Sequence, residues 1–321
     1  MNQHKIKIAS YWATSCGGCD VSLLDTGMKV LLLADAADIV FWPILMDAKE
    51  ANVEAMPKDS IDLCFFNGSI RSSENAKMAH LLRKKSKILV AFGACAQTGG
   101  IHGLINTTDT KTIKDTVFIS GPSVHNPNGV IPVPILRIPE GKLSLPTLFE
   151  TVKSLGDIVA VDYYIPGCPP AVPRLSEIID VIIAGELPPK GSVLGATDKA
   201  LCETCYRIRH DRKIDSFTRP HLMKQDPETC FLEQGLLCLG PVTRGGCAEQ
   251  CIRGNMPCRG CYGVTPGVID PGGAMIGVLA SLIKSDDPGA IDRAVESLSD
   301  MLGNLYQFTY ASSLLKRVNK K

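Results

Sequence analysis

The strongest constraint in this sequence is a block of eight cysteines within residues 202–261. Six of them fall in the run from Cys230 to Cys261, among glycine, proline and arginine residues. Free cysteine packs as a small hydrophobe, but its chemistry usually decides where it is kept. Because no core-forming periodicity accompanies this block, we expect its sulfur atoms to be metal ligands or to form disulfides.

The rest of the composition narrows the choice between these two roles. A net charge of +1 and 6% aromatic residues indicate neither a nucleic acid nor a membrane surface as a partner. No apolar stretch is long enough to span a bilayer, and residues 1–10 lack the features of a targeting segment. We therefore expect a cytoplasmic protein, in which thiols stay reduced. Thirteen cysteines in that compartment indicate bound metal.

Residues 1–185 have the pattern of an α/β domain. Apolar segments that predict strands alternate with amphipathic segments that predict helices, the first of them capped by Asp20. This alternation is typical of a parallel sheet covered by helices on both faces. The strands are expected at 5–11, 41–45, 61–66, 87–92 and 157–165, the helices at 20–36, 72–86, 147–155 and 172–185, and a loop at 101–135.

Four cysteines follow predicted strands of this domain. Cys16 and Cys19 come after the first strand, Cys95 after the strand at 87–92, and Cys168 after the last one. The carboxyl ends of parallel strands meet at one edge of the sheet, where ligands bind in such folds. We therefore expect these four thiols to converge from three separate loops.

A segment rich in proline and glycine, 186–200, predicts the boundary to a second domain, 186–321. This domain contains the cysteine block and shows little periodicity, so we expect bound metal to hold it together. Near its end, apolar residues recur at helical spacing and are expected to pack as core. This stripe consists of Ile291, Val295, Leu298, Leu302 and Leu305.

The cysteine count fits three sites of four thiolates each. The sheet edge supplies one site and the block supplies two, which leaves Cys64, inside the strand at 61–66, as a buried structural thiol. Zinc held by paired C-x₂-C knuckles is the main alternative. However, four other cysteines at irregular spacing separate Cys202–Cys205 from Cys258–Cys261. This irregular spacing favours iron–sulfur clusters, although the bacterial ferredoxin pattern is absent.

The sequence shows no sign of a catalytic pocket. It has no nucleophile motif, no glycine-rich dinucleotide loop and no P-loop. A chain with three clusters and no catalytic group is predicted to relay electrons. Residues 202–224 contain six Lys or Arg against three Asp or Glu. They form either a solvated basic face or a set of cations that raise the reduction potential of a nearby cluster.

These residues resemble the small subunit of [NiFe] hydrogenases over roughly residues 5–265. The motifs that carry the resemblance are C-x-G-C at 16–19, GACAQTGGI from 93 and PGCPP from 166. The resemblance implies a flavodoxin-like first domain that binds a proximal [4Fe-4S] cluster, with medial and distal clusters in the second domain. The implied proximal ligands are Cys16, Cys19, Cys95 and Cys168.

The resemblance also divides the eight remaining cysteines. Cys202 stands where periplasmic members have a histidine ligand of the distal cluster, and Cys251 where their three-iron medial cluster has a proline. Two further [4Fe-4S] clusters are thereby implied. The medial ligands are Cys247, Cys251, Cys258 and Cys261, and the distal ligands are Cys202, Cys205, Cys230 and Cys238.

Other departures from the family concern proton transfer and oxygen. Ser15 and Asn67 occupy positions where many members have glutamate. Gly18 and Gly100 stand where oxygen-tolerant members have extra cysteines near the proximal cluster. We therefore expect an oxygen-sensitive enzyme.

All-cysteine clusters without an export signal are most similar to the gamma subunit of the deazaflavin-nonreducing hydrogenases of methanogenic archaea. The implied partners are a large subunit that carries the Ni–Fe site, an iron–sulfur adaptor (delta) subunit and heterodisulfide reductase. Three alternatives remain open: a deazaflavin-reducing or sulfur-reducing cytoplasmic hydrogenase, a quinone-reductase-type subunit, which would lack the eight-cysteine domain, and a zinc-stabilised interaction protein.

Overall fold

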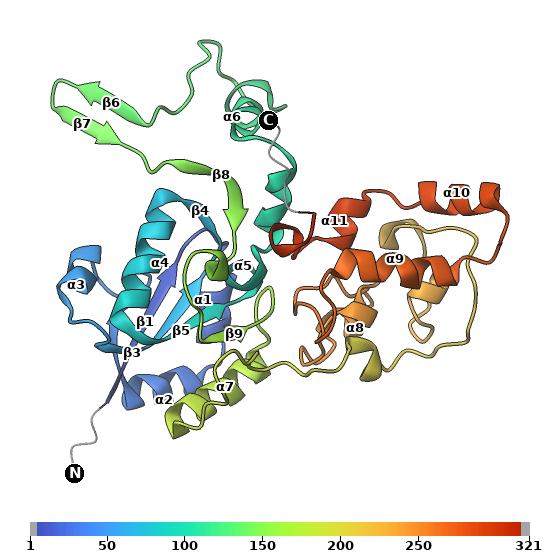
Figure 1. Cartoon of the computed structure of the whole chain (residues 1–321), viewed down its shortest axis with the longest axis horizontal. Helices are drawn as coiled ribbons and strands as arrows, with labels where there is room; N and C mark the ends of the chain where they lie inside the picture. Colours follow the sequence, from blue (N-terminus) through green and yellow to red (C-terminus); the bar gives the residue numbers. More distant parts are fainter. Residues whose placement is uncertain (1–4, 316–321) are drawn as a thin grey trace.

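The structure, a computed structural model, describes residues 5–315. Its centre is a five-stranded parallel sheet in the order β2-β1-β3-β5-β9 (Figure 1). This is the flavodoxin-like order, whose switch point lies between its first and third strands. The strands are β1 (Ile6–Trp12), β2 (Ala37–Phe41), β3 (Ile61–Asn67), β5 (Ser86–Phe92) and β9 (Tyr163–Ile165).

Helices cover both faces of the sheet, as predicted. One face packs against α1 (Gly18–Leu24), α2 (Met28–Ala36) and α7 (Val172–Ala184). The other packs against α3 (Glu50–Ala55), α4 (Ser73–Lys85) and α5 (Ala94–Thr98). Successive strand residues alternate between the two cores, so that Phe65 belongs to the first and Phe66 to the second. A sheet buried on both faces explains why the strands are almost entirely apolar.

Several predicted elements are wrong or misplaced. The helix predicted over 147–155 is instead strand β8 (Leu148–Lys153), which pairs antiparallel with β4 (Ile70–Ser72). The helix over 20–36 is two helices, because the chain turns at Gly27, whose φ is 62°. The strand expected at 41–45 ends at Phe41, before Pro43, and the last strand covers only Tyr163–Ile165 of its predicted range.

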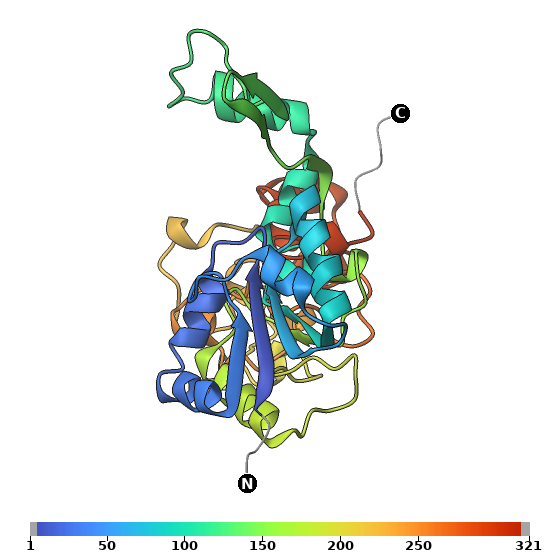
Figure 2. The same ribbon diagram turned by 90° about the vertical axis from the view of Figure 1, so that its left-hand side faces the viewer.

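The segment predicted as a loop, 101–135, begins with short helices. These are η1 (Ile101–Thr107), α6 (Thr110–Asp115) and the π-turn η2 (Thr116–Ser120). The chain then extends into a hairpin of β6 (Ile135–Ile138) and β7 (Gly141–Ser144). Figures 1 and 2 both show this hairpin projecting from the body of the molecule.

The second half of the chain has few long elements and its own apolar core. Its α-helices are α8 (Gln250–Arg253), α9 (Pro271–Leu282), α10 (Pro288–Glu296) and α11 (Met301–Leu305). Short 3₁₀ turns precede α8, namely η4 (Leu201–Glu203), η5 (Pro220–Leu222), η6 (Leu232–Gln234) and η7 (Gly240–Val242), and η8 (Tyr310–Ser312) follows α11.

The apolar stripe at the end of the chain belongs to two helices rather than one. Asp300, with φ of 50°, separates α10 from α11. Leu305 is buried in the core, with Leu298 and Leu302 packed against it, whereas Val295 is 42% exposed. The expectation of core packing therefore holds for the C-terminal part of the stripe.

The segment predicted as a linker is partly attached to the sheet. Val193 forms a bridge with Tyr164, and Leu194 is buried in the core of the first domain. In the opposite direction, the carbonyl of Phe308 accepts a hydrogen bond of 2.6 Å from the Thr98 hydroxyl. The segment around Phe308 thus packs against the first domain. The boundary at 185/186 stays a prediction.

Candidate functional site: three sets of cysteines

The loops after β1, β5 and β9 bring the four predicted proximal cysteines together. The backbone of Gly93 donates to Ile165 (2.7 Å) and that of Ala94 to Gly167 (2.8 Å), which joins the second loop to the third. Burial and then the thiols of Cys95 and Cys168 raise the pKa of Cys19. The convergence predicted from the strand order is therefore present.

The backbone around this set is fitted to sulfur. A Cβ at Gly100, where φ is +60°, would lie 2.6 Å from the Cys95 sulfur, and one at Gly93 would collide with the Cys19 sulfur. Only glycine permits so close an approach. Cys19 and Cys95 are buried, whereas Cys16 and Cys168 are exposed. The set is thus open on one side.

The protonation chemistry of these thiols fits ligands of a metal cluster. Burial, followed by the neighbouring thiols of Cys168 and Cys16, raises the pKa of Cys95 to about 12. Thiols in such an environment ionise only when bound metal compensates the negative charge. Four convergent thiols with glycines against the sulfurs suit an iron–sulfur cluster, whose ligands are cysteine thiolates.

A buried carboxylate lies directly behind the proximal set, and sequence reasoning missed its role. Asp20, predicted as a helix cap, is 2% exposed. It accepts hydrogen bonds from Trp42 Nε1 (3.0 Å), Asn67 Nδ2 (2.5 Å) and the Ser10 hydroxyl (3.4 Å). The actual N-cap of α1 is Gly17. Only the position of Asp20 next to Cys19 could have indicated this network.

The predicted medial cysteines also lie together. Burial raises the pKa of Cys261 to about 12, and the thiols of Cys251 and Cys247 add to this effect. Burial likewise raises the pKa of Cys258, with contributions from Cys261 and Cys247. Backbone hydrogen bonds from residues 249, 250 and 260 lower the pKa values of Cys247 and Cys258. Such donors are typical around the sulfurs of iron–sulfur clusters.

The predicted distal cysteines form a third group. Burial raises the pKa of Cys202 to about 11, and the thiols of Cys230 and Cys205 act in the same direction. Burial raises the pKa of Cys238, and the thiols of Cys258 and Cys202 raise it further. A Cβ at Gly240 would lie 2.9 Å from the Cys202 sulfur.

The three sets lie in a row. The proximal and medial sets meet where the backbone of Gly167 donates to the carbonyl of Cys261 (3.2 Å), and a hydrogen bond from the Cys168 backbone lowers the pKa of Cys261. The medial and distal sets meet where the backbone of Cys258 donates to the sulfur of Cys238 (3.3 Å). The medial set therefore lies between the other two.

Cys64 is fully buried in β3, within the apolar core that also contains Phe66 and Leu89. Burial raises its pKa to about 12, while the Ser86 hydroxyl acts in the opposite direction. Among residues 5–315, no three His, Cys, Asp or Glu side chains are grouped closely enough to hold a single metal ion. The ligands of a four-iron cluster have a different requirement, since they bind separate irons.

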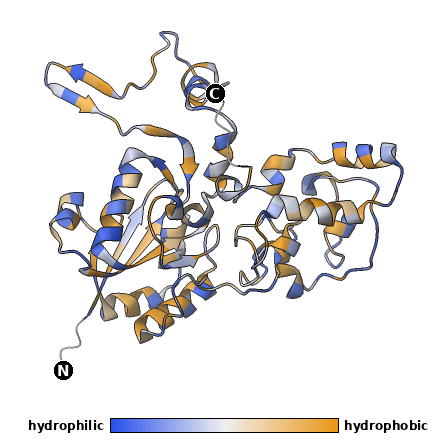
Figure 3. Cartoon of the chain, viewed as in Figure 1, coloured by the Kyte–Doolittle hydropathy of each residue, from blue (hydrophilic) through white to orange (hydrophobic). Residues whose placement is uncertain are grey.

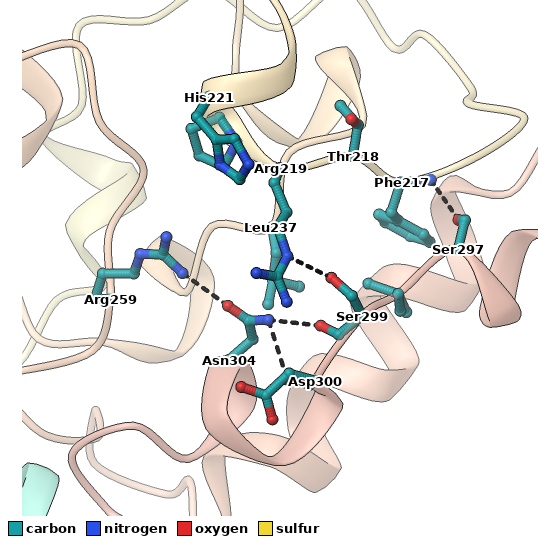
Figure 4. Close-up of a pocket in the computed structure, with 12 residues that line it drawn as sticks. Phe217, Thr218, Arg219, His221, Leu237, Arg259, Ser297, Ser299, Asp300 and Asn304 are labelled. Atoms are coloured by element: carbon teal, nitrogen blue, oxygen red, sulfur yellow. Dashed lines mark hydrogen bonds between the residues drawn. The ribbon is translucent and has the colours of Figure 1, made fainter. Parts of the chain in front are cut away.

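A small cavity of about 170 Å³ lies beside the medial set, between residues 217–221 and 297–304 (Figure 4). Arg259, which lies between Cys258 and Cys261 in sequence, donates from Nη1 to Asn304 Oδ1 (2.8 Å) across this cavity. On the same wall, Arg219 Nε donates to the Ser299 hydroxyl (2.7 Å). The first contact attaches the medial loop to α11, and the second attaches the segment around Arg219 to the residues just before that helix.

Comparison with known proteins identifies the family. The model of the NADH ubiquinone oxidoreductase 20 Kd subunit family matches residues 16–183. The chain is 36% identical to the iron-sulfur subunit of the F420-non-reducing hydrogenase of Archaeoglobus profundus, with 98% of each chain covered. It is 34% identical to a subunit of the F420-non-reducing hydrogenase of Methanothermobacter marburgensis, with 99% of this chain and 98% of the relative covered.

Among solved structures, a chain of an NAD⁺-reducing [NiFe]-hydrogenase in the H₂-reduced state aligns with a TM-score of 0.49 and 30% identity, over 58% of this chain and 94% of that one. No helix within residues 5–315 is long and apolar enough to cross a membrane. The family model matches residues 16–183, and both relatives align with almost the whole chain. The chain therefore belongs to the NADH ubiquinone oxidoreductase 20 Kd subunit family and, within it, to the small subunits of [NiFe] hydrogenases of the F420-non-reducing type.

Proposed function

We propose that this chain relays electrons for a hydrogenase through three [4Fe-4S] clusters. The observation that carries the proposal is the row of three cysteine sets, joined at Cys168–Cys261 and at Cys258–Cys238. When bound, such clusters accept and release single electrons. No catalytic side chain is required of this subunit, because hydrogen is split on the large subunit in hydrogenases of this family.

The chain would supply the cluster ligands, exclude water from the clusters and hold the three sites at fixed positions. The proximal ligands would be Cys16, Cys19, Cys95 and Cys168, the medial ligands Cys247, Cys251, Cys258 and Cys261, and the distal ligands Cys202, Cys205, Cys230 and Cys238. The hydrogen bonds of Cys261 with residues 167 and 168 keep the first two sets in contact. Burial of Cys19, Cys95, Cys238 and Cys258 excludes water from one side of each site.

The proposed electron acceptor lies at the distal end. There, a hollow of about 510 Å³ is lined by Cys230 together with Arg209, Arg212 and Lys213. Asp211 and Glu233 also line this hollow, so its three cations leave a small excess of positive charge toward a protein partner. Because the chain resembles the small subunits of deazaflavin-nonreducing hydrogenases, we propose that the acceptor is an iron–sulfur adaptor (delta) subunit. Beyond this adaptor, the electrons would reach heterodisulfide reductase. The cysteine count suits a reducing compartment, so we place the complex in the cytoplasm.

Metal analysis of the anaerobically purified protein tests the proposal. We expect roughly twelve irons and twelve acid-labile sulfides per chain, no stoichiometric zinc, and EPR signals of reduced four-iron clusters. About three zincs per chain without sulfide would instead support the zinc-stabilised interaction protein. About eleven irons with a three-iron signal would keep the relay but contradict the assignment of Cys251.

The identity of the acceptor needs a separate measurement. Purification of the tagged chain from its own organism, followed by mass spectrometry, would show which subunits accompany it. We expect a nickel-containing large subunit, the adaptor and heterodisulfide reductase in stoichiometric amounts. A deazaflavin-reducing or sulfur-reducing partner in their place would favour the corresponding alternative hydrogenase.

A further inference from the structure

The hairpin that projects from the first domain is unusual because nothing in the described chain covers it. Every residue of the arm, residues 127–148, is exposed. Nine large apolar side chains are among them, with exposed fractions from 37% to 68%. Figure 3 shows hydrophobic residues along both strands of the hairpin, away from the body. Exposed apolar surface of this extent marks an interaction site.

The register of the hairpin gathers apolar side chains on one face. Leu136 lies opposite Leu143, and alternation along the strands adds Ile138 and Leu145 to the same face. On the other face, Arg137 lies opposite Lys142. Like charges at paired positions repel, and an isolated two-stranded hairpin is marginal in water. The arm therefore needs a partner that buries the apolar face and supplies acidic groups to the basic one.

The root of the arm is attached beside the proximal set. The backbone of Ser73 donates to Thr147 O (2.9 Å), and the backbone of Thr147 donates back to the Ser73 hydroxyl (3.0 Å). Thr14, two residues before Cys16, donates from its hydroxyl to Asn75 Oδ1 (2.9 Å) in the first turn of the same helix. Thr14 also lines a hollow of about 540 Å³ with Val133 and Leu145 of the arm.

We propose that the arm is a docking surface for the nickel-carrying large subunit of the hydrogenase. The inference rests on the proposed function, in which electrons enter at the proximal set. Electron transfer weakens steeply with distance, so the donor subunit must cover the exposed side of Cys16 and Cys168. The arm extends from the same edge of the sheet, and Thr14, in the loop that carries Cys16, lines a hollow together with residues of the arm. The acceptor, by contrast, is expected at the distal set.

The test compares two variants of the tagged chain produced in its own organism. Leu136→Asp combined with Leu143→Asp places charge on the apolar face of the arm. Ile269→Asp, at a side chain that is 80% exposed in the second domain, is the matched control. We expect the arm variant to bring down about tenfold less nickel-carrying large subunit than the unaltered chain, and the control to bring down an unchanged amount.

Two further readouts make the result decisive. Iron content and the EPR signals of the arm variant should equal those of the unaltered chain, which shows that the subunit has folded. A photo-crosslinking residue placed at Leu136 should attach to the large subunit. The proposal is wrong if the arm variant recovers as much large subunit as the unaltered chain, or if the arm variant and the control lose it equally. A crosslink to a second copy or to another subunit, or the absence of any crosslink, would also overturn it.

These outcomes separate the arm from the proposed function. If the unaltered chain purified without any nickel-carrying subunit, or without iron, the proposed function would fail first and the docking surface would fail with it. If the unaltered chain purified with that subunit and the arm variant did so equally well, only the docking surface would be wrong.

Discussion

At the scale of single residues, Cys64 is the cysteine that the count of three sites leaves over. It is 0% exposed inside β3. We expect Cys64→Ser to keep all of its iron, because this side chain belongs to none of the three sets. Burial of the new hydroxyl should lower the free energy of unfolding by about 1–2 kcal/mol. Iron analysis and EPR check the first expectation, with Cys95→Ser as the comparison that should lose the proximal signal. A loss of about four irons from Cys64→Ser would refute the ligand assignment.

Cys251 is a second position at which one residue decides the type of site. It lies in the first turn of α8, where proline is tolerated because the backbone N–H has no helical partner. We expect Cys251→Pro to fold and to convert the medial cluster to a three-iron form. EPR of the oxidised protein would show this form as a new signal, and Cys251→Ala serves as the control for loss of the thiol alone. A spectrum identical to that of the unaltered protein would mean that Cys251 is not a ligand.

At the scale of elements, the strands of the sheet were predictable because their surroundings are uniform. Apart from Asp62 and Lys87, which pair with each other, residues 61–66 and 87–92 are apolar, and both segments form central strands. Since parallel strands end at one edge, the convergence of Cys16, Cys95 and Cys168 followed from their places in the sequence.

The segment 147–155 could not be predicted in the same way. Its strand β8 depends on distant partners: Asn106 binds both the N–H and the C=O of Val152, and β4 supplies the neighbouring strand. Contacts with these distant residues stabilise a strand where the local sequence pattern predicts a helix. The network around Asp20 was hidden for the same reason, because its donors Ser10, Trp42 and Asn67 come from three separate segments.

Asp270, the N-cap residue of α9, also binds Tyr306 and Leu314, and these contacts allow a prediction about local stability. Asp270 accepts hydrogen bonds from the backbone of Gly273 (2.9 Å), the Tyr306 hydroxyl (2.6 Å) and the backbone of Leu314 (3.0 Å). Asp287 caps α10 through a single bond to Ala290 (2.9 Å). Loss of a cap costs about 1 kcal/mol, and loss of the other two bonds adds to it. We therefore expect Asp270→Ala to speed amide exchange at 272–275 and 314 more than Asp287→Ala does at 289–292. Equal effects would mean that the additional bonds contribute nothing.

The same carboxylate gives a pH dependence. Burial alone would raise the pKa of Asp270, but the hydrogen bonds from Tyr306 and the backbone outweigh it and lower the pKa below the ordinary 3.8. A group whose pKa is lower in the folded state stabilises the fold above its unfolded-state pKa and loses this effect as the pH falls through the folded-state value. The difference in amide exchange between the unaltered protein and Asp270→Ala should therefore be constant at neutral pH and shrink only well below pH 4.

At the scale of the whole molecule, the two halves of the chain meet where two cysteine sets meet. Beside the contact between Gly167 and Cys261, the backbone of Ala171 donates to the hydroxyl of Tyr262 (3.1 Å). Tyr262 is 3% exposed, so water cannot replace its hydroxyl when it is removed. The spacing between the proximal and medial sets thus depends on hydrogen bonds between the PGCPP loop and the last C-x-x-C loop.

Tyr262→Phe tests this dependence, because it leaves the N–H of Ala171 buried without a partner. Such a group costs about 1–3 kcal/mol, which corresponds to roughly 5- to 150-fold faster exchange of the Ala171 amide. The iron content should stay unchanged, since no ligand is altered. Tyr206→Phe is the comparison: its hydroxyl donates to Ile252 O (3.0 Å) within the second domain, and its loss should leave the Ala171 amide as it was. If Tyr262→Phe left the exchange of the amides of residues 167, 168 and 171 unchanged, packing alone would hold the two halves together, and the hydrogen bonds at the junction would not set the spacing between the proximal and medial sets.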